Sequence, residues 1–138
     1  MELTELTLTF HANYLNLMRQ ISSKHQISIS QLLCVISIPY KGIQQIELAK
    51  ILSLDVSTLS RNLDKLIARE LIIKKKAQLD QRAYQISLSS QGKQLYEDIM
   101  LNINTLYQSV YLKLDDMEIE QFKEILIKLN WLFISHEN

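Results

Sequence analysis

Apolar side chains recur every three or four residues at both ends of the chain, which is the pattern of amphipathic helices. The first helix is predicted to end near Lys24, with an apolar stripe of Leu3, Leu6, Phe10, Tyr14, Leu17, Met18 and Ile21. Ser28 and Gln31 have the spacing of a capping box, which predicts a second helix that stops before Pro39. Helical spacing returns after Ser89, and Asp115 is expected to cap a final helix.

The middle of the chain combines two short helical patterns with two strand patterns. Residues 46–52 predict one helix, and Asp55 is expected to cap the next. The second helix has a predicted buried side of Val56, Leu59, Leu63, Leu66 and Ile67, and an opposite polar side of Ser57, Thr58, Arg61, Asn62 and Lys65. Residues 71–76 and 83–88 predict two strands joined as a hairpin. Together these elements describe a winged helix-turn-helix with a two-stranded wing, in a mainly α (α+β) fold with long flanking helices.

Composition excludes several classes of function. The 138 residues include two glycines, 50 positions apart, so no glycine-rich phosphate loop is expected. A lone Cys34 excludes an intramolecular disulfide and any cysteine-based zinc cluster, and it fits a reducing, cytoplasmic setting. No apolar run approaches a membrane helix, and the first ten residues lack the basic residues of a signal peptide.

Charge is segregated along the chain although the formal net charge is zero. Residues 1–43 carry +1, residues 44–94 carry +4, and residues 95–138 carry −5. We therefore expect only the middle segment to contact an anionic partner such as double-stranded DNA. We expect one domain over residues 1–138, with 44–94 as the DNA-binding lobe. The apolar stripes of the terminal helices predict that 1–43 and 95–138 are helical dimerisation regions.

The order of motifs in this middle segment resembles the MarR family of bacterial transcriptional regulators. Residues 55–61, DVSTLSR, are similar to the family's recognition-helix opening, and residues 80–83, DQRA, are similar to its wing signature. Residues 47–49 (ELA), 66–72 and 87–92 (SLSSQG) also resemble family motifs in the same order. The resemblance implies a homodimer that binds a palindromic operator, with recognition helices in two major grooves and wings in the flanking minor grooves.

Three features of the sequence depart from the family pattern. Glu70 stands where a glycine usually ends the recognition helix, and Ser53 stands where a glycine usually separates the two short helices. A non-glycine residue in a left-handed cap costs about 1 kcal/mol, so the recognition helix is expected to end differently. Residues 77–79, AQL, replace a more polar, proline-bearing wing tip.

The candidate DNA-binding residues lie on the polar side of the second short helix and on the wing: Ser57, Thr58, Ser60, Arg61, Asn62, Lys65, Lys74, Lys75, Lys76, Asp80 and Arg82. An arginine on a recognition helix can pair with guanine O6 and N7, and an asparagine can pair with adenine. The short hydroxyl side chains can bind phosphates or cap the helix. Lys74–Lys76 are expected to make non-sequence-specific phosphate contacts, or to be a charged edge that deters strand pairing.

The resemblance implies that Arg82 enters the minor groove. Asp80 lies two positions earlier on the same side of a strand, so its carboxylate can orient that guanidinium. The alternative is a surface salt bridge, worth under about 1 kcal/mol.

An effector site is implied by the resemblance alone. His11, Tyr14, Tyr40 and Trp131 are the candidates for a pocket that binds a small lipophilic or phenolic ligand, and core or interface packing is their alternative role. Cys34 lies in an apolar run, which favours a core thiol over a redox sensor. The three histidines have no ligand spacing, so no metal and no other cofactor is expected.

The leading hypothesis is a homodimeric transcriptional regulator, a repressor that responds to a small effector. Two alternatives remain open: a DNA-binding protein that needs no effector, and a winged-helix module that binds proteins. Salt-sensitive DNA affinity would discriminate against the protein-binding module. An enzyme is not expected, because no nucleophile, paired carboxylate or histidine-based constellation stands out in the sequence.

Overall fold

A computed structural model describes residues 1–79 and 83–136 of the chain. It contains two compact units, residues 1–103 and 104–138, and each is considered by itself. In the described residues of the first unit, the elements in chain order are α1 (Leu3–Lys24), α2 (Ile29–Ser37), β1 (Ile43–Gln44), α3 (Gln45–Leu52), α4 (Val56–Ala68), β2 (Ile72–Lys76) and β3 (Tyr84–Leu88). Helix α5 (Ser90–Tyr111) runs from the first unit into the second, which also holds α6 (Asp116–His136).

Local capping bonds fix several of the helix starts. The Ser28 hydroxyl accepts from the Gln31 backbone N–H at 3.1 Å, and the Gln31 side chain accepts from the Ser28 backbone N–H. Asp115 and Glu118 form the same reciprocal pair ahead of α6. Both caps were predicted from sequence, and the structure confirms them, because such bonds join residues only three positions apart.

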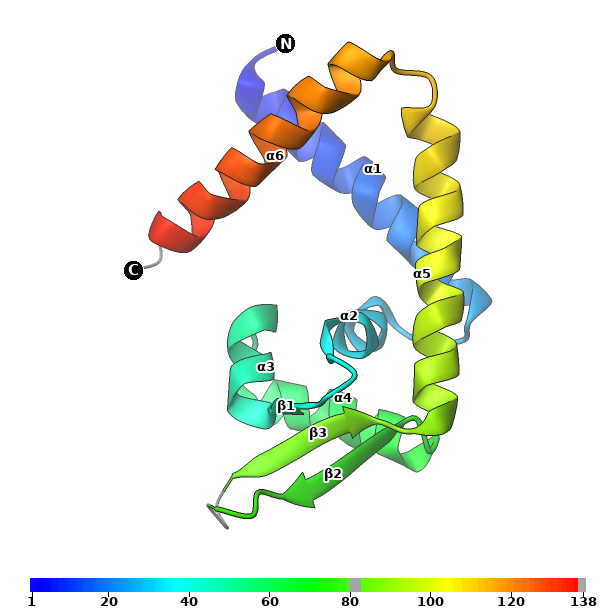
Figure 1. The fold of residues 1–138 in the computed structure, drawn as a ribbon, viewed down its shortest axis with the longest axis vertical. Helices are drawn as coiled ribbons and strands as arrows, with labels where there is room; N and C mark the ends of the chain where they lie inside the picture. Colours follow the sequence, from blue (N-terminus) through cyan, green and yellow to red (C-terminus); the bar gives the residue numbers. More distant parts are fainter. Residues whose placement is uncertain (80–82, 137–138) are drawn as a thin grey trace. The chain divides into compact units, whose positions relative to one another are not determined.

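The lobe that holds α2, α3 and α4 packs against a small antiparallel sheet of order β1-β3-β2 (Figure 1). Lys74 lies opposite Ile86 in the register of the β2–β3 hairpin, and Ile43 of β1 pairs with Ile86 from the other side. The sheet of the wing therefore has a third strand that the sequence pattern did not predict. A two-residue strand is too short to show the alternation that marks a strand.

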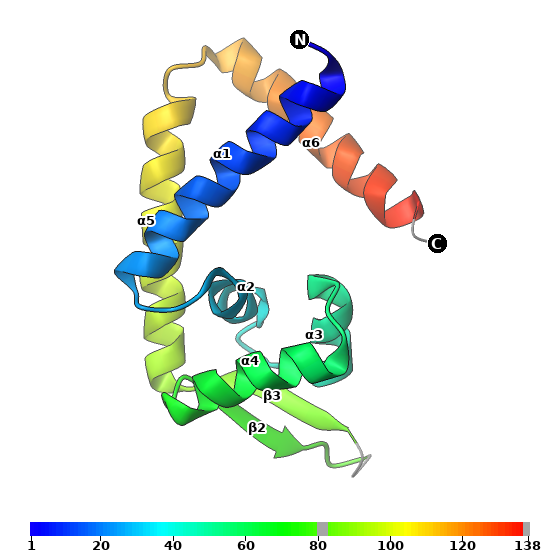
Figure 2. The ribbon, with the colours of Figure 1, turned by 180° about the vertical axis from the view of Figure 1, so that it is seen from behind.

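The core lies between α2, α4 and the sheet, and the buried stripe of α4 supplies much of it. Leu59, Leu63 and Leu66 are fully buried, as their spacing predicted. Val56 was predicted to join that stripe, but its side chain is 53% exposed. Val56 is the first residue of α4, where the helix does not yet pack against the core. Figure 2 shows α4 in front of the sheet, with α3 at its N-terminal end.

Contacts of α1 and α5 join the flanking helices within the first unit. Lys24 Nζ donates to Asn102 Oδ1 at 3.2 Å, and Asn102 Nδ2 lies 2.8 Å from His25 Nε2. At the start of α5, a Cβ added to Gly92 would lie 2.0 Å from the carbonyl oxygen of Leu71, the residue before β2, so only glycine allows the helix to approach the backbone this closely. Among the described residues, no helix is long and apolar enough to cross a membrane.

Candidate nucleic-acid interface

The start of α4 is organised by the carboxylate of Asp55. Its Oδ1 accepts from the Thr58 backbone N–H and from the Ser57 hydroxyl, both at 2.7 Å, and its Oδ2 accepts from the Thr58 hydroxyl at 3.0 Å. These bonds, the Ser57 hydroxyl first, lower the pKa of Asp55 from 3.8 to about 2. The predicted cap is confirmed, and it also fixes two of the candidate DNA-binding hydroxyls.

Arg61 lies one turn further along the same face. Its Nη2 donates to the Thr58 hydroxyl oxygen at 3.3 Å, so Asp55, Thr58 and Arg61 form one chain of hydrogen bonds. An arginine has five N–H donors, and the remaining ones stay available at this exposed position.

The outer face of α4 borders a shallow hollow of about 480 Å³, lined by Ser30, Thr58, Arg61, Asn62, Asp64 and Lys65. It brings together four of the predicted residues. Ser30, at the start of α2, was not predicted, because only the packing of α2 on α4 places it there. Hydroxyl, amide and cationic groups gathered in one hollow are what contacts to bases and phosphates require.

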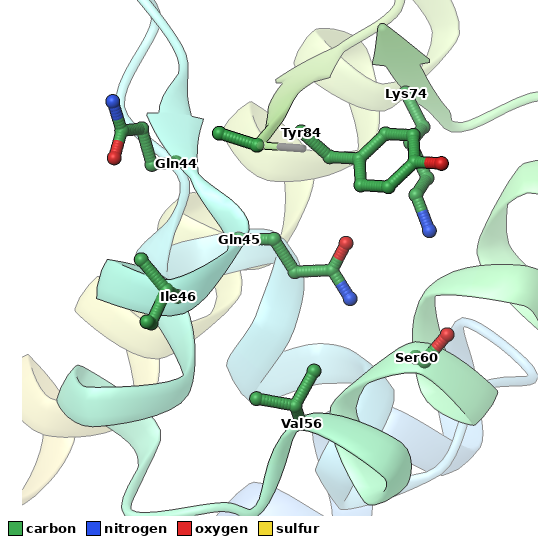
Figure 3. A pocket seen from close by; sticks show the side chains of 8 residues that line it. Gln44, Gln45, Ile46, Val56, Ser60, Lys74 and Tyr84 are labelled. Carbon is green, nitrogen blue, oxygen red and sulfur yellow. The ribbon is translucent and has the colours of Figure 1, made fainter. Parts of the chain in front are cut away.

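Ser60 is separated from this face, because its side chain is directed toward the wing. It lines a cavity of about 520 Å³ between α3, α4 and the sheet, together with Gln45, Lys74 and Tyr84 (Figure 3). Lys74 Nζ lies 4.3 Å from the centre of the Tyr84 ring, a cation–π contact. Lys74 is half-buried, whereas Lys75 and Lys76 are exposed. The three lysines therefore do not form one uniform patch.

Gln45 is a buried polar residue of this cavity that the sequence did not single out. It is 7% exposed, and its Oε1 accepts no hydrogen bond from the described residues. Figure 3 shows its amide directed into the cavity between Ser60 and Lys74. A buried acceptor without a partner costs about 1–3 kcal/mol, so a hydrogen-bond donor in the cavity would be stabilised there. No sequence signal distinguishes Gln45 from its neighbour Gln44.

Asp80 and Arg82 at the wing tip lie outside the described residues, so their predicted pairing stays a prediction.

None of the four candidate effector residues lines the cavities described above. His11 and Tyr14 are exposed on α1, and Trp131 is exposed on α6 in the second unit. The Tyr40 hydroxyl donates to Glu97 Oε1 at 2.9 Å, and this bond raises the pKa of Tyr40. The ring of Tyr40 also packs edge-on against Tyr96. The effector pocket stays a prediction.

Cys34 is fully buried in α2. Burial raises the pKa of its thiol to about 11, so the reactive thiolate is disfavoured at neutral pH. Both observations favour the packing role predicted from sequence over a redox role.

The family model described as transcriptional regulator SarA/Rot matches residues 16–99, which span the helix-turn-helix and the wing. The chain belongs to the SarA/Rot family of transcriptional regulators. It is a DNA-binding regulator, as the sequence predicted.

Solved structures show that this SarA/Rot-family chain has the MarR-type winged-helix fold. The apo form of MarR from E. coli is 24% identical, with 94% of this chain and 96% of that chain covered and a TM-score of 0.80. A cysteine-to-serine mutant of the same protein, complexed with operator DNA, is also 24% identical, with 92% of each chain covered and a TM-score of 0.78. A mutant of MepR from S. aureus is 23% identical, with 96% and 99% covered and a TM-score of 0.76.

Proposed function

We propose that this regulator binds a palindromic operator as a homodimer, with α4 of each copy in the major groove and each wing in a flanking minor groove. The observation that carries the proposal is the hollow along the outer face of α4, where Thr58, Arg61, Asn62 and Lys65 converge. Exposed lysines 75 and 76 on β2 add positive charge for the DNA backbone. Arg82 is proposed as the minor-groove residue, on the strength of its wing motif.

A second copy is supported by the apolar side chains that α1 and α6 expose. On α6 these are Met117, Ile125, Leu126, Ile127, Leu129, Trp131, Leu132, Phe133 and Ile134. So many exposed apolar side chains on one helix are typical of a surface that a partner covers. A dimer with two-fold symmetry would read two half-sites about 10 base pairs apart, centre to centre.

The proposal is tested by selecting DNA sites from a random library and footprinting the bound site. We expect a palindromic site and protection over two successive turns. Arg61→Ala should relax the preference at particular base pairs and weaken binding by about 1–3 kcal/mol if the contact is bidentate. A matched control is Lys128→Ala, which removes a charge from α6. An Arg61→Ala variant that binds the selected site as tightly as the parent and keeps the parent's base preferences would contradict this role of α4.

We further propose that the regulator represses transcription by occupying its operator, and that a small lipophilic or phenolic effector releases it by changing the spacing of the two DNA-binding lobes. The aromatic side chains of Tyr14, Tyr40 and Trp131 are chemically suited to such a ligand. Titration with phenolic anions should lower operator affinity. An affinity that no such ligand changes would favour the alternative of an effector-independent DNA-binding protein.

A further inference from the structure

We propose that Asp55 is a positioning residue that turns Ser57 and Thr58 into hydrogen-bond acceptors toward DNA, so that the start of α4 reads the exocyclic amino group of adenine or cytosine. The inference rests on the proposed function, in which α4 enters the major groove. The sequence left two roles open for these hydroxyls, phosphate binding or helix capping, and the inference departs from the first of them.

The direction of the hydrogen bonds follows from the chemistry of the carboxylate. An ionised carboxylate has no hydrogen to donate, so both hydroxyl groups that contact Asp55 must donate to it. The distances are 2.7 Å from Ser57 Oγ to Oδ1 and 3.0 Å from Thr58 Oγ1 to Oδ2. Each hydroxyl hydrogen is therefore already engaged before DNA arrives.

What remains on each hydroxyl oxygen is the capacity to accept. Ser57 Oγ is exposed and retains its lone pairs. Thr58 Oγ1 accepts one bond from Arg61 Nη2 and retains a second acceptor position. The oxygens of a DNA phosphate also only accept, so they form no hydrogen bond with these groups. The negative charge of Asp55 beside them further opposes a phosphate at this point.

Base edges in the major groove offer the complementary group. Adenine presents its N6 amino group there and cytosine its N4 amino group, whereas guanine and thymine present acceptors and no amino donor. Arg61 supplies donors one helical turn away and is tied to Thr58. The start of α4 should therefore select an amino-bearing base close to a guanine in each half-site.

The first test removes one partner of the proposed contact at a time. Sites are selected with the parent and with Thr58→Val, which keeps the backbone N–H that Asp55 caps. We expect the variant to lose the preference for adenine or cytosine at one position of each half-site. Replacing that base in the parent's site with its amino-free analogue, purine or 2-pyrimidinone, should weaken parent binding roughly 2- to 10-fold and leave Thr58→Val unaffected.

The second test reverses the direction of the hydrogen bond between residue 55 and the Thr58 hydroxyl. In Asp55→Asn the new amide nitrogen would donate to Thr58 Oγ1 and free the threonine hydrogen to point at DNA. The selected base should then change to guanine or thymine, which present acceptors. Asparagine is as good a helix cap as aspartate, so α4 should keep its start, which circular dichroism checks.

The matched control is Glu47→Gln, which removes the same charge from the exposed side of the neighbouring helix α3 while Ser57 and Thr58 keep their partner. It should raise affinity for all sequences alike and leave the base preference intact. If Thr58→Val binds all sequences more weakly but keeps the base preference, Thr58 contacts a phosphate. That result would overturn this inference and leave the proposed function standing. A parent that selects no sequence would overturn both the inference and the proposed function.

Discussion

Glu70 ends α4 in the left-handed backbone conformation, with φ of 60°. The Leu71 N–H donates to the Leu66 carbonyl at 3.0 Å and the Glu70 N–H donates to the Ile67 carbonyl at 2.9 Å, which is the usual closure of a helix with glycine at this position. The sequence-based expectation that the helix would end differently is therefore wrong. Tertiary packing holds this turn in place although Glu70 is unfavourable in the left-handed conformation. Ser53 behaves in the same way at the end of α3, with φ of 53°.

The strain at Glu70 predicts a stabilising substitution. Glu70→Gly should raise the free energy of unfolding by about 0.5–1 kcal/mol, because relief of the left-handed penalty exceeds the entropy cost of a glycine. Urea denaturation followed by circular dichroism measures it. Glu70→Ala is the control and should not stabilise, since alanine keeps its Cβ. A glycine variant no more stable than the alanine variant would show that position 70 carries no strain.

Asp55 predicts a dependence of stability on acid pH. Its folded-state pKa of about 2 lies below the ordinary value of 3.8, so the carboxylate stabilises the fold above pH 3.8. That contribution is lost as the pH falls from about 4 to about 2. Thermal unfolding of the parent and of Asp55→Asn should differ above pH 4 and converge toward pH 2. A difference that stays constant over this range would mean that Asp55 titrates alike in the folded and unfolded chains.

At the scale of elements, strand β2 places three lysines that are consecutive in the sequence in different environments. Successive residues of a strand point to opposite faces, so Lys74 is directed toward the cavity with Tyr84 while Lys75 faces the other way. A sequence run of three lysines thus has more than one environment.

Lys75 provides the salt test for the wing. Each phosphate contact contributes about −0.9 to the slope of log affinity against log salt, so Lys75→Ala should shallow the slope by up to about two in a dimer. The base preference should stay as in the parent. Fluorescence anisotropy with the selected site across a salt series measures both quantities, with Lys128→Ala on α6 as the control. An unchanged slope would show that Lys75 contacts no phosphate.

At the scale of the whole molecule, the exposed apolar residues of α6 predict self-association. Sedimentation at micromolar concentration should show a dimer, and Phe133→Glu should shift it to monomer because a buried unpaired charge opposes association. Asn130→Glu introduces the same charge at a position that is polar already and should leave the dimer intact. A parent that sediments as a monomer at this concentration would remove the basis for a palindromic operator.

The sequence by itself determined the helices, the N-terminal caps of α2, α4 and α6, and the order of the winged helix-turn-helix. Those features depend on periodicity and on bonds between residues a few positions apart, as in the Ser28–Gln31 and Asp115–Glu118 boxes. It also indicated the DNA-binding class, because the positive charge gathers around residues 44–94. The family model confirms that class.

Tertiary structure decided which of the candidate residues share a surface. Ser30 joins the hollow beside α4, while Ser60 turns to the cavity with Gln45. Strand β1 exists only because β3 offers it a partner. These outcomes depend on contacts between residues far apart in the chain, which no local pattern encodes. The Thr58 hydroxyl is an intermediate case. The sequence predicted that Asp55 caps this helix, but only the structure shows that the Thr58 hydroxyl donates its hydrogen to Asp55.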